Sequence, residues 1–229
     1  MDREIIIENV RRWQARIGEA SAKWGGCEIC AVTKTQDAET INIAHDAGIR
    51  TIGENRVQEL MGKIDGLNPA FDIHLIGALQ TNKVKYIIDR VNTIQSVDRI
   101  ALADEISRRA VSAGVKMNVL LQVNIARESQ KSGVDEDELM ALVRHCAALD
   151  GVCVKGLMSI MPITDNPEEL RPYFRRMRGW FDRLRDENIG NISMDVLSMG
   201  MSGDCIVAAE EGATMVRLGR AIFGARPAK

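Results

Sequence analysis

The chain has 229 residues, 45% of them hydrophobic, with a formal net charge of −2 and interspersed charges of both signs. With aromatic residues at 4% and no basic stripe, the composition argues against a nucleic-acid partner. No apolar run approaches the length of a membrane span, and the charged start Met1-Asp2-Arg3-Glu4 is unlike a signal peptide, so we expect a cytoplasmic protein without a membrane partner.

Residues 3–23 predict an amphipathic helix, because Ile6, Val10, Trp13 and Ile17 recur at helical spacing. Short apolar runs then alternate with longer helical patterns. The predicted strands are 28–33, 49–53, 72–77, 92–97, 117–124, 152–158, 193–198 and 214–218. The helical patterns between them lie around 37–47, 55–64, 80–89, 98–113, 135–149, 167–188 and 203–211.

The predicted strands are typical of a parallel sheet covered by helices. Runs such as Val119–Val123 are almost continuously apolar, as in strands buried on both faces. Eight alternating strand–helix units in 229 residues indicate an α/β protein with a (β/α)8 TIM barrel, a fold that typically takes about 250 residues. The alternative is an open doubly wound sheet, but no predicted unit carries its G-x-G-x-x-G turn. Because no linker divides the chain, we predict a single domain, 1–229, with residues 1–27 packing a helix on the barrel.

The functional site of such a barrel lies at the carboxyl ends of its strands. Two glycine-rich turns follow the last two predicted strands, at 198–204 and 216–221, where barrels commonly bind phosphate. In the first, Gly200 and Gly203 bracket Ser202, which adds a hydroxyl donor to the backbone N–H groups. Gly219 and Arg220 form a second amide pair. The alternative is that both are ordinary turns.

Lys34 follows the first predicted strand, at the same edge as these turns. A partly buried amine has a lowered pKa and becomes a nucleophile toward aldehydes. One amine and two anion-binding turns therefore suggest a Schiff base with a phosphorylated aldehyde, for which pyridoxal phosphate is the obvious candidate. The alternatives are an ordinary surface lysine and an aldolase that uses Lys34 on a sugar phosphate.

Arg217 ends the last predicted strand and is a candidate partner for the pyridine nitrogen of that cofactor. A guanidinium only donates hydrogen bonds, so it favours an unprotonated nitrogen and a weaker electron sink. Racemisation or simple carriage is then favoured over transamination. The alternative is a salt bridge from Arg217 to Glu54.

Four further residues are expected near the site. His74 has either a core or supporting position or a role in proton transfer, and Asn55 either caps a helix or contacts the cofactor. Met158 and Met201 are expected to pack around the site. The five cysteines are interpreted as buried small hydrophobes, and no metal site is expected.

Several segments together resemble one known family. They are Ala31–Thr35, Gly53–Glu59, His74–Lys83, Lys131–Gly133, Gly156–Met158, Leu197–Asp204, Val216–Gly219 and Ile222–Arg226. With them, the chain closely resembles the pyridoxal phosphate homeostasis protein family, which consists of single-domain barrels similar to the N-terminal domain of alanine racemase. The resemblance covers about residues 28 to 226.

The resemblance implies a Schiff base at Lys34, phosphate contacts from Ser202 and the Gly219–Arg220 turn, and Arg217 facing the ring nitrogen. It also implies a pocket lined by Asn55, His74, Met158 and Ser198. The chain departs from the family pattern at Arg220, where a serine or threonine is frequent.

The resemblance further implies a protein that binds and delivers pyridoxal 5′-phosphate, with apo-enzymes as recipients and no catalytic turnover of its own. The alternative is an amino-acid racemase of narrow scope. Against it, the chain lacks the β-rich domain that supplies a second catalytic base, and Tyr86 and Tyr173 both lie in helical patterns. The missing domain also favours a monomer.

Overall fold

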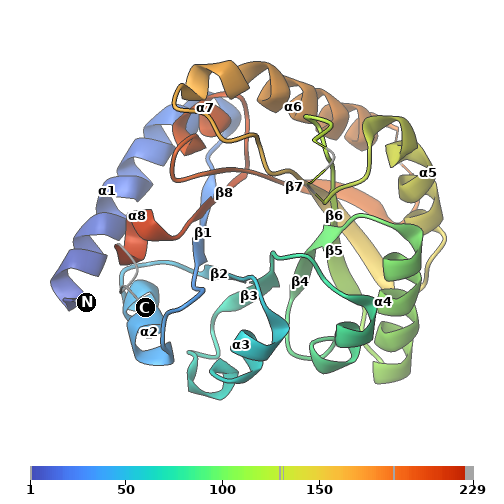
Figure 1. Ribbon diagram of the computed structural model, residues 1–229, viewed down its shortest axis with the longest axis horizontal. Helices are drawn as coiled ribbons and strands as arrows, with labels where there is room; N and C mark the ends of the chain where they lie inside the picture. The colour runs from blue at the N-terminus through green and yellow to red at the C-terminus, as the bar shows by residue number, and fades with distance from the viewer. Residues whose placement is uncertain (1, 129, 131, 188, 225–229) are drawn as a thin grey trace.

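The structure, a computed structural model, describes residues 2–128, 130, 132–187 and 189–224. Eight parallel strands form a closed barrel in sequence order, with β8 pairing back to β1 (Figure 1). The strands are β1 Glu28–Val32, β2 Thr51–Glu54, β3 Asp72–Leu75, β4 Thr93–Val97, β5 Met117–Gln122, β6 Val152–Met158, β7 Ile192–Met201 and β8 Met215–Leu218. The predicted (β/α)8 barrel is therefore confirmed, and the open doubly wound sheet is excluded.

A ring of helices surrounds the barrel (Figure 1). The α-helices are α1 Arg3–Ser21, α2 Ala38–Asp46, α3 Val57–Met61, α4 Ile100–Ala113, α5 Glu136–Ala147, α6 Arg171–Asp186, α7 Cys205–Glu210 and α8 Arg220–Phe223. Short 3-10 helices are η1 Ala22–Trp24, η2 Ile64–Gly66, η3 Thr81–Tyr86 and η4 Pro167–Leu170. None of these described helices is long and apolar enough to cross a membrane.

Helix α1 covers the part of the barrel where the last strand meets the first (Figure 1). Its predicted apolar face is buried at Ile6, Val10 and Ile17, and it packs against α2, α7 and α8. The Asn9 side chain also donates a hydrogen bond to the Ile222 carbonyl, across 213 positions of sequence. Because α7 has 6 residues and α8 only 4, α1 supplies the apolar cover that these short helices lack.

Three predicted helices are shorter or less regular than their sequence patterns suggest. The 55–64 pattern yields only α3, which ends at Met61, followed by the separate η2. The 80–89 pattern forms the 3-10 helix η3, because its β-branched residues have low helix propensity. The 167–188 pattern is divided at Pro172, which lies in the first turn of α6 after η4.

The barrel separates two groups of buried side chains. One large apolar core lies between the strands and the helices, while Cys30, Ile76 and Met215 form a small cluster of their own inside the barrel. Alternate side chains of a strand face opposite sides of the sheet, so each strand also directs side chains into the interior of the barrel. Among the cysteines, Cys27 and Cys153 are only half-buried, which corrects the expectation that all five are buried.

Gly156 lies at an irregularity of β6, where the register shifts relative to both neighbouring strands. Its φ of 150° is rare for other residues, and a Cβ there would lie 1.8 Å from the Val196 carbonyl oxygen. Strand β7 therefore approaches β6 at a distance that only glycine permits.

Gly156→Ala should destabilise the protein by about 3 kcal/mol or more, because the new methyl group meets rigid backbone. The matched control is Gly179→Ala in α6, where a Cβ meets nothing within 4 Å. We expect that change to stabilise by about 0.5–1 kcal/mol through helix propensity. Urea unfolding of both variants measures the difference; equal stabilities would contradict the assigned strand contact.

Candidate functional site

A cavity of about 450 Å³ opens at the carboxyl end of the barrel. Its walls come from the turn after β1, the segment after β6, and the turns after β7 and β8. Six of the predicted site residues line it: Lys34, Met201, Ser202, Arg217, Gly219 and Arg220. The fold thus brings the lysine and both glycine-rich turns to one cavity, although they are far apart in sequence.

Four other predicted site residues are not among the described residues that line this cavity. Met158 and Ser198 are fully buried in the strands, and His74 is 3% exposed in β3. Asn55 is half-buried after β2, and its amide oxygen is buried without a hydrogen-bond partner among the described residues. The N-cap of α3 is Arg56, so the alternative of Asn55 as the helix cap is wrong.

The Lys34 turn has an uncommon backbone conformation. Lys34 is half-buried, and Thr35 after it has a φ of 68°, in the left-handed region that β-branched residues rarely adopt. The Thr35 N–H donates to the Glu59 carboxylate. Such a conformation persists where its surroundings enforce it, so the position of Lys34 is set by contacts outside the turn.

Lys63 supplies most of those contacts. Its Nζ donates to the Thr33 carbonyl at 2.9 Å and to the Gln36 carbonyl at 3.0 Å, on either side of Lys34. It also lies 2.6 Å from Glu54 Oε1, and the Lys63 and Glu54 side chains are only 10% and 0% exposed. Burial raises the pKa of the Glu54 carboxyl, while bonds from Lys63 and Thr33 oppose that rise. One buried ion pair therefore fastens both ends of the turn.

Sequence reasoning missed Lys63. It lies four residues after Glu59, a spacing that is common on exposed helix faces. The signal that points to it is Glu54 at the end of an apolar strand, because a buried carboxylate needs a cation. That cation is Lys63, so the alternative of a salt bridge between Glu54 and Arg217 is not found.

The first glycine-rich turn starts later than predicted, since β7 continues through Ser198 to Met201. Gly200 has a φ of 94°, and a Cβ there would lie 2.5 Å from the Ala208 methyl. Asp204 closes the turn by accepting a hydrogen bond from the Met201 N–H at 2.5 Å. Burial raises the pKa of Asp204, although this bond opposes the rise. Ser202 lies at the tip of the turn, on the cavity wall.

The second glycine-rich turn joins β8 to α8. The Gly219 carbonyl accepts from the N–H groups of Ile222 and Phe223. The N–H groups of Arg220 and Ala221 precede the first bonds of the helix, so the helix itself provides no acceptor for them. With Ser202 nearby in the same cavity wall, this turn presents hydrogen-bond donors to the cavity.

Arg217 is 4% exposed and reaches the cavity from β8. It donates to Ser198 Oγ and to the Ser159 carbonyl, each at 2.7 Å. Among the described residues it pairs with no carboxylate. Burial lowers the pKa of its guanidinium, which nevertheless stays protonated in proteins. Two of its five N–H donors are used in these bonds, and the guanidinium suits a ligand that offers a hydrogen-bond acceptor.

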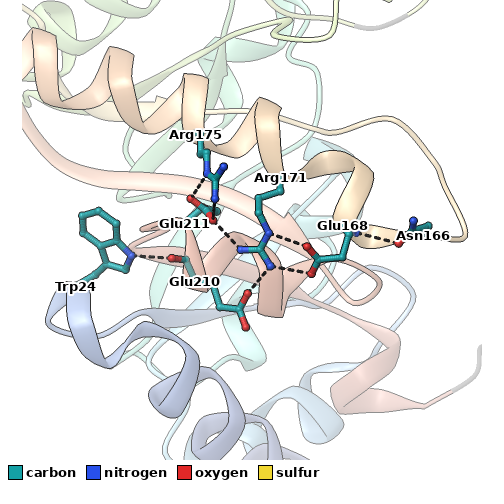
Figure 2. A network of polar contacts seen from close by, with 7 residues as sticks. All are labelled: Trp24, Asn166, Glu168, Arg171, Arg175, Glu210 and Glu211. Carbon is teal, nitrogen blue, oxygen red and sulfur yellow. Dashed lines mark hydrogen bonds and ion pairs between the residues drawn. The ribbon is translucent and has the colours of Figure 1, made fainter.

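A charged network, drawn in Figure 2, lies beside the cavity. Arg171, at the start of α6, binds Glu168, Glu210 and Glu211 at 2.6–2.7 Å, and Arg175 binds Glu211 as well. Pro167 and Leu170 of η4 line the cavity beside this network. Since Glu210 and Glu211 follow the turn of Ser202 through α7, the network joins two cavity walls.

Lys131 and residues 225 and 226 of the family motifs lie outside the described residues. Within the described part of the chain, no three His, Cys, Asp or Glu side chains gather as a metal site.

Comparison with known proteins identifies relatives of the chain over nearly its whole length. Residues 1–227 match the family described as alanine racemase, N-terminal domain. A curated relative from Aquifex aeolicus, named pyridoxal phosphate homeostasis protein, is 43% identical over 96% of this chain and 97% of its own. The structure of PipY from Synechococcus elongatus with pyridoxal phosphate (PLP) bound has a TM-score of 0.85 and 32% identity, covering 96% of this chain and all of that one.

A more distant likeness concerns the fold alone. Alanine racemase from Corynebacterium glutamicum has a TM-score of 0.74 at 18% identity, and the match covers 99% of this chain but 62% of that enzyme.

Lys63→Met should lower the free energy of unfolding by about 3–5 kcal/mol, because it leaves the Glu54 carboxylate buried without its cation. The double variant Glu54→Gln/Lys63→Met should recover most of that loss. The control Lys116→Met, at an exposed lysine before β5, should stay within about 0.5 kcal/mol of the wild type. Urea unfolding measures all three; an equal loss in the single and double variants would contradict the buried pair.

Proposed function

The chain belongs to the pyridoxal phosphate homeostasis protein family, and we propose that it binds pyridoxal 5′-phosphate at the mouth of its barrel as a carrier protein. The observation that carries the proposal is the composition of one cavity: a lysine, two turns rich in N–H donors and a buried guanidinium without a carboxylate partner among the described residues. These groups fit an aldehyde, a phosphate and a pyridine nitrogen. The PLP-bound structure of PipY supports the same assignment.

Lys34 is the proposed site of covalent attachment. Its Nζ attacks the aldehyde carbon, water leaves, and a carbon–nitrogen double bond remains as a Schiff base. The Lys63 contacts on both sides of Lys34 keep the turn in place without using the Lys34 amine.

The phosphate is proposed to bind between the two turns. Ser202 offers its hydroxyl, the Gly219–Arg220 turn offers backbone N–H groups, and the Arg220 side chain adds positive charge where the family often has a hydroxyl. Arg217 then donates to the ring nitrogen and keeps it unprotonated, because a guanidinium cannot accept a proton. That favours carriage over reactions that need a strong electron sink.

The remaining predicted residues receive supporting roles in this proposal. Met201 contacts the cofactor from the rim, where its side chain lines the cavity. Asn55 offers an unpartnered amide oxygen beside the site, and Met158 packs beneath it. Ser198 and His74 do not contact the cofactor themselves but support Arg217.

Carriage is preferred over racemisation because no tyrosine lines the described cavity, and Asp204, the one carboxylate that does, is held by the Met201 N–H. Tyr86 lies 48% exposed on η3, Tyr173 lies on α6, and neither lines the cavity. We propose that the cofactor is passed to apo-enzymes that depend on it, by a cytoplasmic and monomeric protein.

After incubation with pyridoxal 5′-phosphate and reduction by borohydride, the wild-type protein should carry the label on the peptide that contains Lys34. Lys34→Ala should lose this label and the visible absorbance band. Lys116→Ala, at the other end of the barrel, is the matched control and should be labelled like the wild type. Peptide mass mapping identifies the position; a label retained by Lys34→Ala would contradict the attachment site.

A carrier should not exchange the α-protons of amino acids. We expect no deuterium incorporation when the loaded protein is incubated with each common amino acid in deuterated water, as measured by NMR. Exchange that disappears in Lys34→Ala would instead establish the racemase alternative.

A further inference from the structure

A line of hydrogen bonds runs inside the barrel, from the cavity toward the opposite end. Arg217 Nη1 donates to Ser198 Oγ at 2.7 Å, and Ser198 Oγ donates to Gln95 Oε1 at 2.7 Å. Gln95 Nε2 lies 2.7 Å from His74 Nδ1, and His74 Nε2 lies 2.9 Å from Asp72 Oδ2. The five residues come from β8, β7, β4 and β3, so the line crosses the interior of the barrel.

Arg217 decides which group donates and which accepts in every hydrogen bond of this line. A guanidinium only donates, so the Ser198 oxygen accepts from Arg217 and its hydroxyl hydrogen points to Gln95. The Gln95 carbonyl is thereby occupied, and its NH2 group faces His74 and the Met215 sulfur at 3.3 Å. His74 accepts at Nδ1, and its Nε2–H faces the carboxylate of Asp72. One arrangement satisfies all five groups.

The middle of this line is fully enclosed by protein. Ser198 and Gln95 are 0% exposed, and His74 is 3% exposed, whereas the Asp72 side chain at the start of β3 is 47% exposed. A buried polar chain is favourable only when each member is satisfied, and its bonds polarise one another. This line of hydrogen bonds directs the Ser198 oxygen toward the buried Arg217 guanidinium. At its other end lies the Asp72 carboxylate, which remains in contact with water.

We propose that Gln95 is a positioning residue for Arg217. By holding the Ser198 hydroxyl hydrogen, it keeps the Ser198 oxygen turned toward the guanidinium, and His74 fixes the orientation of the Gln95 amide. This holds the guanidinium at the angle needed to meet an acceptor in the cavity. The inference rests on the proposed function, in which that acceptor is the pyridine nitrogen.

The test replaces Gln95 by methionine, which has similar length but no hydrogen-bonding amide. The control is Gln122→Met. Gln122 is also a buried strand glutamine, 4% exposed, but it donates to the Ser132 carbonyl, which is not part of this line of hydrogen bonds. We expect Gln95→Met to weaken pyridoxal 5′-phosphate binding about tenfold and to shift the absorption band of the bound cofactor. Gln122→Met should bind with wild-type affinity and spectrum.

A second variant separates orientation from packing. Gln95→Glu keeps the shape and the acceptor for Ser198 but removes the donor to His74, so His74 must carry its proton at Nδ1. Nitrogen-15 NMR of the protein without cofactor reads this directly: the wild type should show a protonated Nε2 and an unprotonated Nδ1, and Gln95→Glu a protonated Nδ1.

Two results would overturn the proposal. One is a folded Gln95→Met protein with wild-type affinity and an unshifted band. The other, which needs no variant to fold, is a wild-type His74 with its proton on Nδ1, because the bonds would then run in the other direction. A wild-type protein that takes up no pyridoxal 5′-phosphate would instead refute the proposed function. The NMR result would still decide the direction of the hydrogen bonds.

Discussion

The burial of one positive charge inside the barrel is the constraint on which the site depends. Arg217 is held in a nearly water-free place without an ion-pair partner among the described residues: the oxygens of Ser198 and Ser159 accept its hydrogen bonds, and the Asp204 carboxylate adds a longer-range attraction. Such a charge is costly unless every neighbouring dipole is oriented correctly. The barrel interior meets that need with polar side chains on strands that would otherwise pack as a purely apolar lumen. The same arrangement makes the cavity selective for groups that accept hydrogen bonds.

The loops at the mouth are fastened by charges placed outside the cavity. Lys63 holds the turn of Lys34 through an ion pair with Glu54 and hydrogen bonds to two backbone carbonyl groups. On the opposite side, Arg171 joins the segment after β6 to the end of α7 (Figure 2). Lys63 binds backbone carbonyl groups and Arg171 binds carboxylates, and neither side chain lines the cavity itself. Fixed walls suit a site that binds through many weak donors, because little conformational entropy is lost on binding.

The sequence predicted the barrel because strand and helix periods alternate regularly, and it predicted six cavity residues because barrels place function at strand ends. It failed where long-range partners decide the outcome. Ser198 is predicted to end its strand and begin the turn, yet β7 continues through it to Met201 and its hydroxyl faces Gln95, 103 positions away. Gln95 and Lys63 look unremarkable in sequence, since neither burial nor a partner across the barrel can be read from neighbouring residues. The predicted helix lengths were wrong where β-branched residues and Pro172 weakened the local helix propensity.

Helix α1 carries a consequence for how the molecule is made. Its buried face and the side chain of Asn9 meet α7, α8 and the Ile222 carbonyl, partners that leave the ribosome only after nearly all of the intervening chain. Until then α1 has only α2 of its three helical partners, and the incompletely covered apolar stripe of Ile6, Val10 and Ile17 exposes the nascent polypeptide to chaperones and to aggregation. Closure of the two ends of the chain is therefore a late event of biosynthesis.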